Sequence, residues 1–200
     1  MPSRSRTAPC AVCLFRAPCL CADLPRVRPR LRIQILRHAA ELTKQSNTAR
    51  WAALALGITP VDYAATRAPF DESQLDLDGA CLLFPATNTL SGPMPAPAPP
   101  PALPPPAPRT LIVPDGTWQQ ARRMISRLPA LAKLPRLSLH AAPAATRLRR
   151  PLEPHGMSTL EAIASALALL GEPAPANELR ALLASVITRI ERLRGRPLHQ

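Results

Sequence analysis

The sequence has few aromatic residues, almost no lysine and no long apolar run. Aromatic residues make up 3% of its 200 residues, so a core built from the 46% that are hydrophobic must consist mainly of Ala, Leu, Ile and Val. No stretch of about 20 consecutive apolar residues is present, which argues against a membrane-spanning helix. The first residues, MPSRSRTAPC, lack the apolar core of a secretory signal. We therefore expect a cytoplasmic protein.

Positive charge is in excess, with 25 Lys and Arg against 13 Asp and Glu, a net charge of +12. Only Lys44 and Lys133 are lysines, so the excess consists of arginine, and a GC-rich genome alone can produce it. A basic chain otherwise suits a phosphate-rich partner, because bound cations release counterions from a nucleic-acid backbone. Both explanations stay open at this point.

Four of the five cysteines lie in one short segment, CAVCLFRAPCLC. Cysteines of cytoplasmic proteins are more often metal ligands or free thiols than disulfides. The spacing of Cys10 and Cys13 is that of a metal knuckle, and with Cys19 and Cys21 they provide the four thiolates of a tetrahedral structural zinc site. An iron–sulfur cluster and metal-free thiols are the alternatives. Cys81 lies in an apolar strand and is expected in the core.

Strand-like and helix-like patterns alternate along the chain, which favours an α/β fold with a mainly parallel sheet. We predict strands at 31–36, 79–86, 111–114 and 134–141, and helices over 46–57, from 117, over 158–171 and over 178–195, with Ser46 and Asn177 as N-caps and Gly57 as a helix end.

The segment 91–108, SGPMPAPAPPPALPPPAP, cannot form a helix or a strand ladder, because proline lacks the N–H and fixes φ. We interpret it as an extended insertion between two core strands. The chain then divides into a cysteine-rich segment with a basic arm, 1–30, and a main domain, 31–200, that contains the insertion.

An acid, a glycine, a hydroxyl and one of two tryptophans follow the predicted strand at 111–114, as Asp115, Gly116, Thr117 and Trp118. In α/β proteins, ligands bind at such strand-to-helix corners. The alternative is local structure, since Asp is a good N-cap and Gly eases a turn. Trp118 could pack in the core or face a ligand.

Two further motifs have both a structural and a functional interpretation. Ser158 and Glu161 form a predicted capping box, and the same helix start offers free N–H groups to a carboxylate. Arginines could clamp phosphate or carboxylate, or lie in solvated loops and ordinary caps. These arginines are Arg50 in SNTAR (46–50) and Arg147, Arg149 and Arg150 in ATRLRRP (145–151).

Taken together, these motifs resemble the DTW-domain family, the tRNA-uridine aminocarboxypropyltransferases. The resemblance is carried by the cysteine cluster, SNTAR, FPA (84–86), DGTW (115–118) with ARRM behind it, TRLRR (146–150) and STLEA (158–162), in family order. This chain departs from the family pattern in having TAR where TGR is usual and slightly closer cysteine pairs.

The resemblance implies a SPOUT-like fold, an α/β domain with a deep trefoil knot at the cofactor site. It also implies that S-adenosylmethionine donates its 3-amino-3-carboxypropyl group to N3 of a uridine in tRNA, with release of methylthioadenosine. No protein partner and no membrane are indicated.

That chemistry suggests a role for each candidate residue. Asp115 and Trp118 would hold the uridine by edge contacts and stacking, with Asp115 as general base only if burial raises its pKa. An apolar slot for the adenine and groups for the donor's carboxylate would come from Phe84, Pro85, Ala86, Val113, Gly116, Thr117, Arg149, Ser158, Thr159 and Glu161. Arg50, Arg147 and Arg150 would contact RNA.

Two other functions remain open from the sequence. A SPOUT-like RNA methyltransferase would use the same donor but attack its methyl carbon. A non-catalytic, zinc-containing RNA-binding module would explain the cysteines and the charge, but not the motifs at the strand ends.

Overall fold

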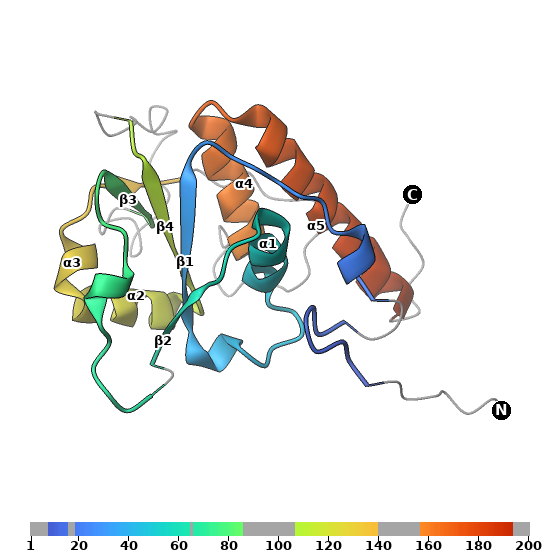
Figure 1. Ribbon diagram of the computed structural model, residues 1–200, viewed down its shortest axis with the longest axis horizontal. Coiled ribbons are helices and arrows are strands. Elements are labelled where there is room, and N and C mark those ends of the chain that lie inside the picture. The colour runs from blue at the N-terminus through green and yellow to red at the C-terminus, as the bar shows by residue number, and fades with distance from the viewer. Residues whose placement is uncertain (1–7, 16–18, 65, 86–106, 140–156, 194–200) are drawn as a thin grey trace, which may run out of the picture.

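A five-stranded parallel sheet is the centre of the protein, in the order β2-β1-β4-β3-β5 (Figure 1). The computed structural model describes residues 8–15, 19–64, 66–85, 107–139 and 157–193. The predicted α/β fold with a parallel sheet is confirmed. The strands are β1 (Arg32–His38), β2 (Val61–Tyr63), β3 (Ala80–Leu83), β4 (Thr110–Asp115) and β5 (Arg136–Leu137).

Helices cover both faces of the sheet (Figure 1). One face packs against α1 (Thr48–Leu56), α4 (Thr159–Leu169) and α5 (Pro173–Leu193), and the other packs against α2 (Trp118–Arg127) and α3 (Pro129–Ala132). The described residues also form short 3-10 helices, which are η1 (Cys21–Asp23), η2 (Ala39–Glu41) and η3 (Glu72–Gln74). None of the helices in the described ranges is long and apolar enough to span a bilayer.

Successive side chains of the central strands point to opposite faces of the sheet, as strand geometry requires. Ile35 and Val113 are buried on the side of α1 and α4, whereas Leu36 and Ile112 are buried on the side of α2. Cys81 lies in the first of these cores, where burial raises the pKa of its thiol to about 11. Its predicted role as a core residue is confirmed.

Two predicted helix starts are wrong. The N-cap of α1 is Asn47, whose side chain accepts from the N–H of Arg50, rather than Ser46. Helix α5 begins at Pro173, so Asn177 lies inside it and is not its cap. The predicted end of α1 is confirmed, because Gly57 adopts φ 67° and closes the helix there.

The cap residues of α2 and α4 show which side chains near the strand ends have only a structural role. Thr117 caps α2 in a box with Gln120, so Asp115 is not a helix cap. The capping box of Ser158 and Glu161 at α4 is confirmed. The carboxylate of Asp115 is therefore used for something other than closing its own turn.

Candidate functional site

A buried carboxylate lies at the carboxyl end of the central strand β4. Asp115 has an exposed fraction of 4%. Its Oδ1 accepts a hydrogen bond of 2.7 Å from the hydroxyl of Thr159, and its Oδ2 accepts one of 2.8 Å from Nδ2 of Asn47. Asn47 precedes α1 and Thr159 begins α4, so three segments far apart in the sequence converge on this group.

Burial raises the pKa of Asp115 above its ordinary value, because it penalises the charged form. The hydrogen bonds from Asn47 and Thr159 oppose this shift by favouring the carboxylate, and the nearby charge of Glu41 adds to it. A raised pKa is what Asp115 needs in order to act as a general base, as expected from the sequence.

The amide of Asn47 has a fixed orientation. Its Oδ1 accepts from the N–H of Arg50 at 2.7 Å as the cap of α1, so its Nδ2 must face Asp115. As part of SNTAR, this residue was not predicted to have a role of its own. The signal was present, since a side-chain amide at an N-cap leaves one polar group free for a second partner.

An ion pair continues this polar row across the sheet. Arg37 lies opposite Asp115 in the ladder of β1 and β4 and opposite Asp62 in the ladder of β1 and β2. It donates to both carboxylate oxygens of Asp62, at 2.7 and 3.1 Å, and is buried. Sequence reasoning missed the pair, although a charged residue directly after a buried apolar strand is a usable signal.

Trp118 lies on the face of the sheet that α2 covers, whereas Asp115 lies on the face of α1 and α4. Its ring is half-buried at the edge of the α2 core and packs against Phe84, with ring centroids 5.2 Å apart and planes at 59°. The guanidinium of Arg136 lies 5.9 Å from the Phe84 ring and donates to the carbonyl of Pro85. The DGTW corner thus divides Asp115 and Trp118 between the two faces.

Of the other predicted donor-binding residues, those that the structure describes lie close to the same strand ends. Val113 is buried in the core, so its side chain is not open to a ligand. Thr117, Ser158 and Glu161 use their side chains in capping boxes. Ala86, Arg149, Arg147 and Arg150 lie outside the described residues.

Arg50 connects the α1 segment to two neighbouring loops. Its guanidinium donates to the carbonyl of Leu42 and, at 3.4 Å, to that of Val12. Its Nε is buried and has no acceptor among the residues that the structure describes. These contacts place Arg50 between the cysteine segment and the site; its predicted contact with RNA stays a prediction.

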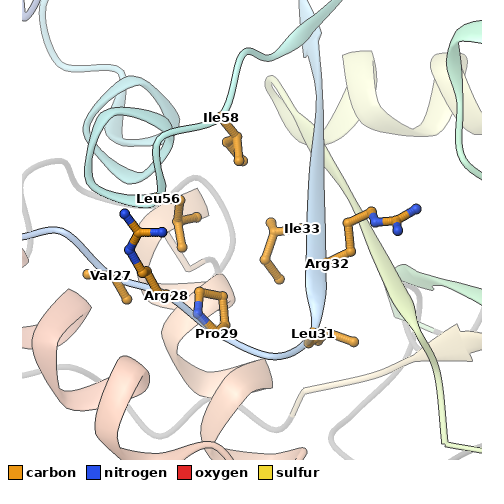
Figure 2. A pocket seen from close by; sticks show the side chains of 8 residues that line it. All are labelled: Val27, Arg28, Pro29, Leu31, Arg32, Ile33, Leu56 and Ile58. Carbon is orange, nitrogen blue, oxygen red and sulfur yellow. The ribbon is translucent and has the colours of Figure 1, made fainter.

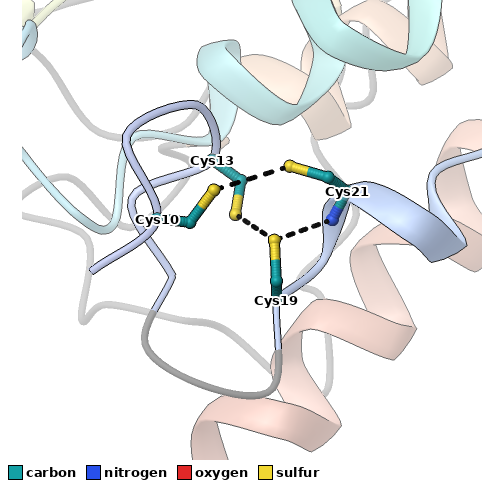
Figure 3. Close-up of side chains that lie close together, drawn as sticks. All are labelled: Cys10, Cys13, Cys19 and Cys21. Carbon is teal, nitrogen blue, oxygen red and sulfur yellow. Dashed lines mark hydrogen bonds between the residues drawn. The ribbon is translucent and has the colours of Figure 1, made fainter. Parts of the chain in front are cut away.

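The four N-terminal thiols converge (Figure 3). Their Sγ atoms all lie within 4.8 Å of one another, with 3.8 Å between those of Cys10 and Cys21 and 3.6 Å between those of Cys13 and Cys19. A tetrahedral zinc with Zn–S bonds of about 2.3 Å separates its sulfurs by about 3.8 Å. The two shorter spacings match that geometry, and the four thiols together can hold a metal ion.

The cysteine segment packs on the same core as α1 and α5. Cys13 is buried, and its carbonyl accepts from the indole N–H of Trp51 at 3.3 Å, while Phe15 packs 5.8 Å from the Trp51 ring. On α5, Arg189 donates to the carbonyl of Cys19 and pairs with Asp23. A metal held here would therefore stabilise contacts with both helices.

A pocket of about 270 Å³ lies at the opposite, amino end of the sheet (Figure 2). Arg28, Ile33, Leu56 and Ile58 are among the residues that line it. In a parallel sheet this end lies the length of β1 away from Asp115, so the pocket does not coincide with the polar cluster. We do not assign it to the candidate site.

The fold and the site define a parallel α/β domain with a buried carboxylate at its strand ends and a four-thiol cluster docked on its helices. The chain belongs to the DTW-domain family, whose model matches residues 7–191, as the sequence motifs predicted. It is 33% identical over 158 residues to tRNA-uridine aminocarboxypropyltransferase 2 of Drosophila melanogaster. That alignment covers 76% of this chain and 62% of the relative, so the chain spans less than two thirds of the relative's length. No solved structure matches the chain significantly.

Proposed function

We propose that this protein transfers the 3-amino-3-carboxypropyl group of S-adenosylmethionine to N3 of a uridine in tRNA. Membership of the DTW family and the name of the fly relative support this assignment. The structural observation that carries it is the buried Asp115, held by Asn47 and Thr159 where the strands end and two helices begin.

The reaction moves one proton and one carbon–sulfur electron pair. The N3–H proton of uridine passes to the carboxylate of Asp115, and the N3 electron pair forms a bond to the methylene carbon next to the sulfonium. The bond from that carbon to sulfur breaks, and its electrons leave with sulfur as neutral methylthioadenosine. A raised pKa improves Asp115 as a base for this weak acid, because proton transfer is most efficient between groups of similar pKa.

Binding of the substrates would use both sides of the corner. The half-buried Trp118, supported from behind by Phe84, would stack on the uracil, and bases gain about 1–3 kcal/mol from such stacking. The donor would lie along the ends of β3 and β4, against Phe84, Pro85, Ala86, Val113, Gly116 and Thr117. Its carboxylate would lie near the start of α4, against Arg149, Ser158, Thr159 and Glu161.

Zinc and tRNA are the other ligands that we propose. Cys10, Cys13, Cys19 and Cys21 would hold one structural zinc, which would order the segment on α1 and α5. Arg50, Arg147 and Arg150 would contact tRNA phosphates, in keeping with the net charge of +12. Affinity for tRNA would then fall as salt rises, and each such contact would make the slope of log affinity against log salt steeper by about 0.7–0.9.

We also propose that the fold is the knotted, SPOUT-like one. The support is topological: β5 is an edge strand, yet α4, which follows it in the sequence, packs against the central strand β4 and against α1. The chain must therefore return from the edge to the middle of the sheet. The residues between the two elements include 140–156, which lie outside the described residues.

Incubation of the purified protein with tRNA and S-adenosylmethionine, followed by nucleoside mass spectrometry, tests the function. A uridine carrying the aminocarboxypropyl mass is expected. A methyl mass would identify an RNA methyltransferase instead. No modified nucleoside, together with tRNA binding, would identify a binding module.

A further inference from the structure

His38, the last residue of β1, has one ring nitrogen engaged and one open. Its Nδ1 accepts a hydrogen bond of 3.1 Å from the N–H of Ala40, in the first turn of η2. A neutral imidazole with an acceptor at Nδ1 carries its proton on Nε2. Nε2 has no partner within the described part of the chain, and the side chain is partly exposed.

The imidazole lies at the DGTW corner. Because Arg37 is opposite Asp115 in the ladder, the next residue, His38, comes beside Gly116. A Cβ at Gly116 would be 3.4 Å from the Cβ of His38, which shows how closely the two strand ends approach. On its other side the ring meets Tyr63, with centroids 6.0 Å apart. The strand end and this aromatic neighbour limit where Nε2 can point.

We propose that Nε2–H of His38 donates a hydrogen bond to a carbonyl oxygen of the target uracil during transfer, an inference that rests on the proposed function. Loss of the N3 proton spreads negative charge onto the two carbonyl oxygens beside N3. A fixed donor at one of them stabilises this anion, as oxyanion-hole donors do. The proton itself goes to Asp115, so His38 keeps its Nε2 proton throughout.

The competing explanation is that His38 only caps η2 through Nδ1. The two roles use different nitrogens, and two substitutions separate them. Asn places an acceptor near the position of Nδ1 but has nothing at Nε2. Gln places a donor near the position of Nε2 but loses the acceptor for Ala40. The pair His38→Asn and His38→Gln therefore tests each role against the other.

Single-turnover transfer to tRNA and thermal unfolding should be measured for the wild type and both variants. We expect His38→Asn to unfold near the wild-type temperature but to transfer about 100- to 1000-fold more slowly, the usual cost of losing one such donor. His38→Gln should unfold at a lower temperature yet transfer within about tenfold of wild type, because a donor is retained at the same place.

The opposite pattern, in which His38→Asn transfers at the wild-type rate and His38→Gln does not, would show that His38 is only a cap. Equal loss in both folded variants would also overturn the proposal, since a donor at the Nε2 position would then not restore transfer. A wild-type protein that forms no aminocarboxypropyl product would overturn the proposed function and this inference with it. Failure of the function is therefore seen in the wild type, and failure of the inference only in the variants.

Discussion

Asp115 is bound by two donors that leave it little freedom. Nδ2 of Asn47 must donate because its oxygen is committed to the cap of α1, whereas the hydroxyl of Thr159 can either donate or accept. An Asn at 115 satisfies both neighbours: its oxygen accepts from Asn47, and its amide donates to Thr159. The substitution keeps the size and the hydrogen bonds but removes the carboxylate.

We expect Asp115→Asn to reduce single-turnover transfer by about two to four decades, as removal of a general base does. Its fold should be intact, because Thr117 and not Asp115 caps α2. Transfer within about tenfold of wild type would reduce Asp115 to a positioning role. Thr159→Val, which keeps the shape and removes one donor to the carboxylate, is the matched variant and should show a smaller loss.

The same variant reveals how the buried acid affects stability. The folded pKa of Asp115 is raised above the ordinary value of 3.8, so the folded state holds this proton more tightly than the unfolded state. The resulting stability is present below about pH 4 and is lost as pH rises through the folded pKa. The Asn variant has no such group. We therefore expect the free energy of unfolding of Asp115→Asn, relative to that of the wild type, to increase as pH rises from about 4 through the folded pKa of Asp115. Denaturant titrations from pH 4 to 8 measure the difference, and a constant difference would contradict the raised pKa.

Helix starts show which parts of the elements could be read from the sequence. Ser158 with Glu161 is a local pattern whose partners are three residues apart, and it was predicted correctly. The cap of α1 was assigned to the wrong residue, Ser46, and Asp115 was left open as a possible cap of α2, because several consecutive residues in SNT and DGT are all good caps. Tertiary contacts decide among them: Asn47 also donates a hydrogen bond to Asp115, which is 68 residues away in the sequence.

The strands, like the helix starts, were predicted in part. The buried runs of β3 and β4 have continuous apolar residues, which is typical of parallel strands covered on both faces, and β1 has a similar run interrupted only by Gln34. The short edge strand β2 was not predicted, because three residues are too few to establish an apolar period. The division of Asp115 and Trp118 between two faces also escaped the sequence, since it follows from the path of the corner over the sheet edge.

The start of α2 depends on a close approach at Gly116. A Cβ there would lie 3.0 Å from Oε1 and 3.1 Å from Cβ of Gln120, the partner of Thr117 in the capping box. We expect Gly116→Ala to disturb this cap, to cost about 0.5–2 kcal/mol of stability and to reduce transfer. Gly57→Ala is the control, because it meets no atom within 4 Å and is strained only by its φ of 67°. It should lose about 1 kcal/mol and keep its transfer rate. Equal transfer by both variants would contradict a role of this corner in the site.

At the scale of the whole molecule, the cysteine segment is part of the common core rather than an appendage, since Cys13 and Phe15 are buried with Trp51. We expect the purified protein to contain one zinc, and chelation to lower its unfolding temperature.

In a Trp118→Phe background, Trp51 is the single tryptophan and its emission should change when the metal leaves. Cys19→Ser should abolish stoichiometric zinc, whereas Cys81→Ala, in β3, should keep it. Elemental analysis that finds no zinc in the wild type would contradict the site.

The contact between Arg189 and Cys19 joins residues 170 positions apart, and this has a consequence for biosynthesis. Cys19 leaves the ribosome 170 residues before Arg189 of α5, one of the two helices that hold the cysteine segment in place. At roughly 5–20 residues per second, the segment waits for about 10–30 s before that helix exists. During this interval any ion that it captures is held without the contacts of α5 and can still exchange with the surrounding solution. The affinity measured on the finished protein would therefore exceed the affinity at which the metal is first chosen.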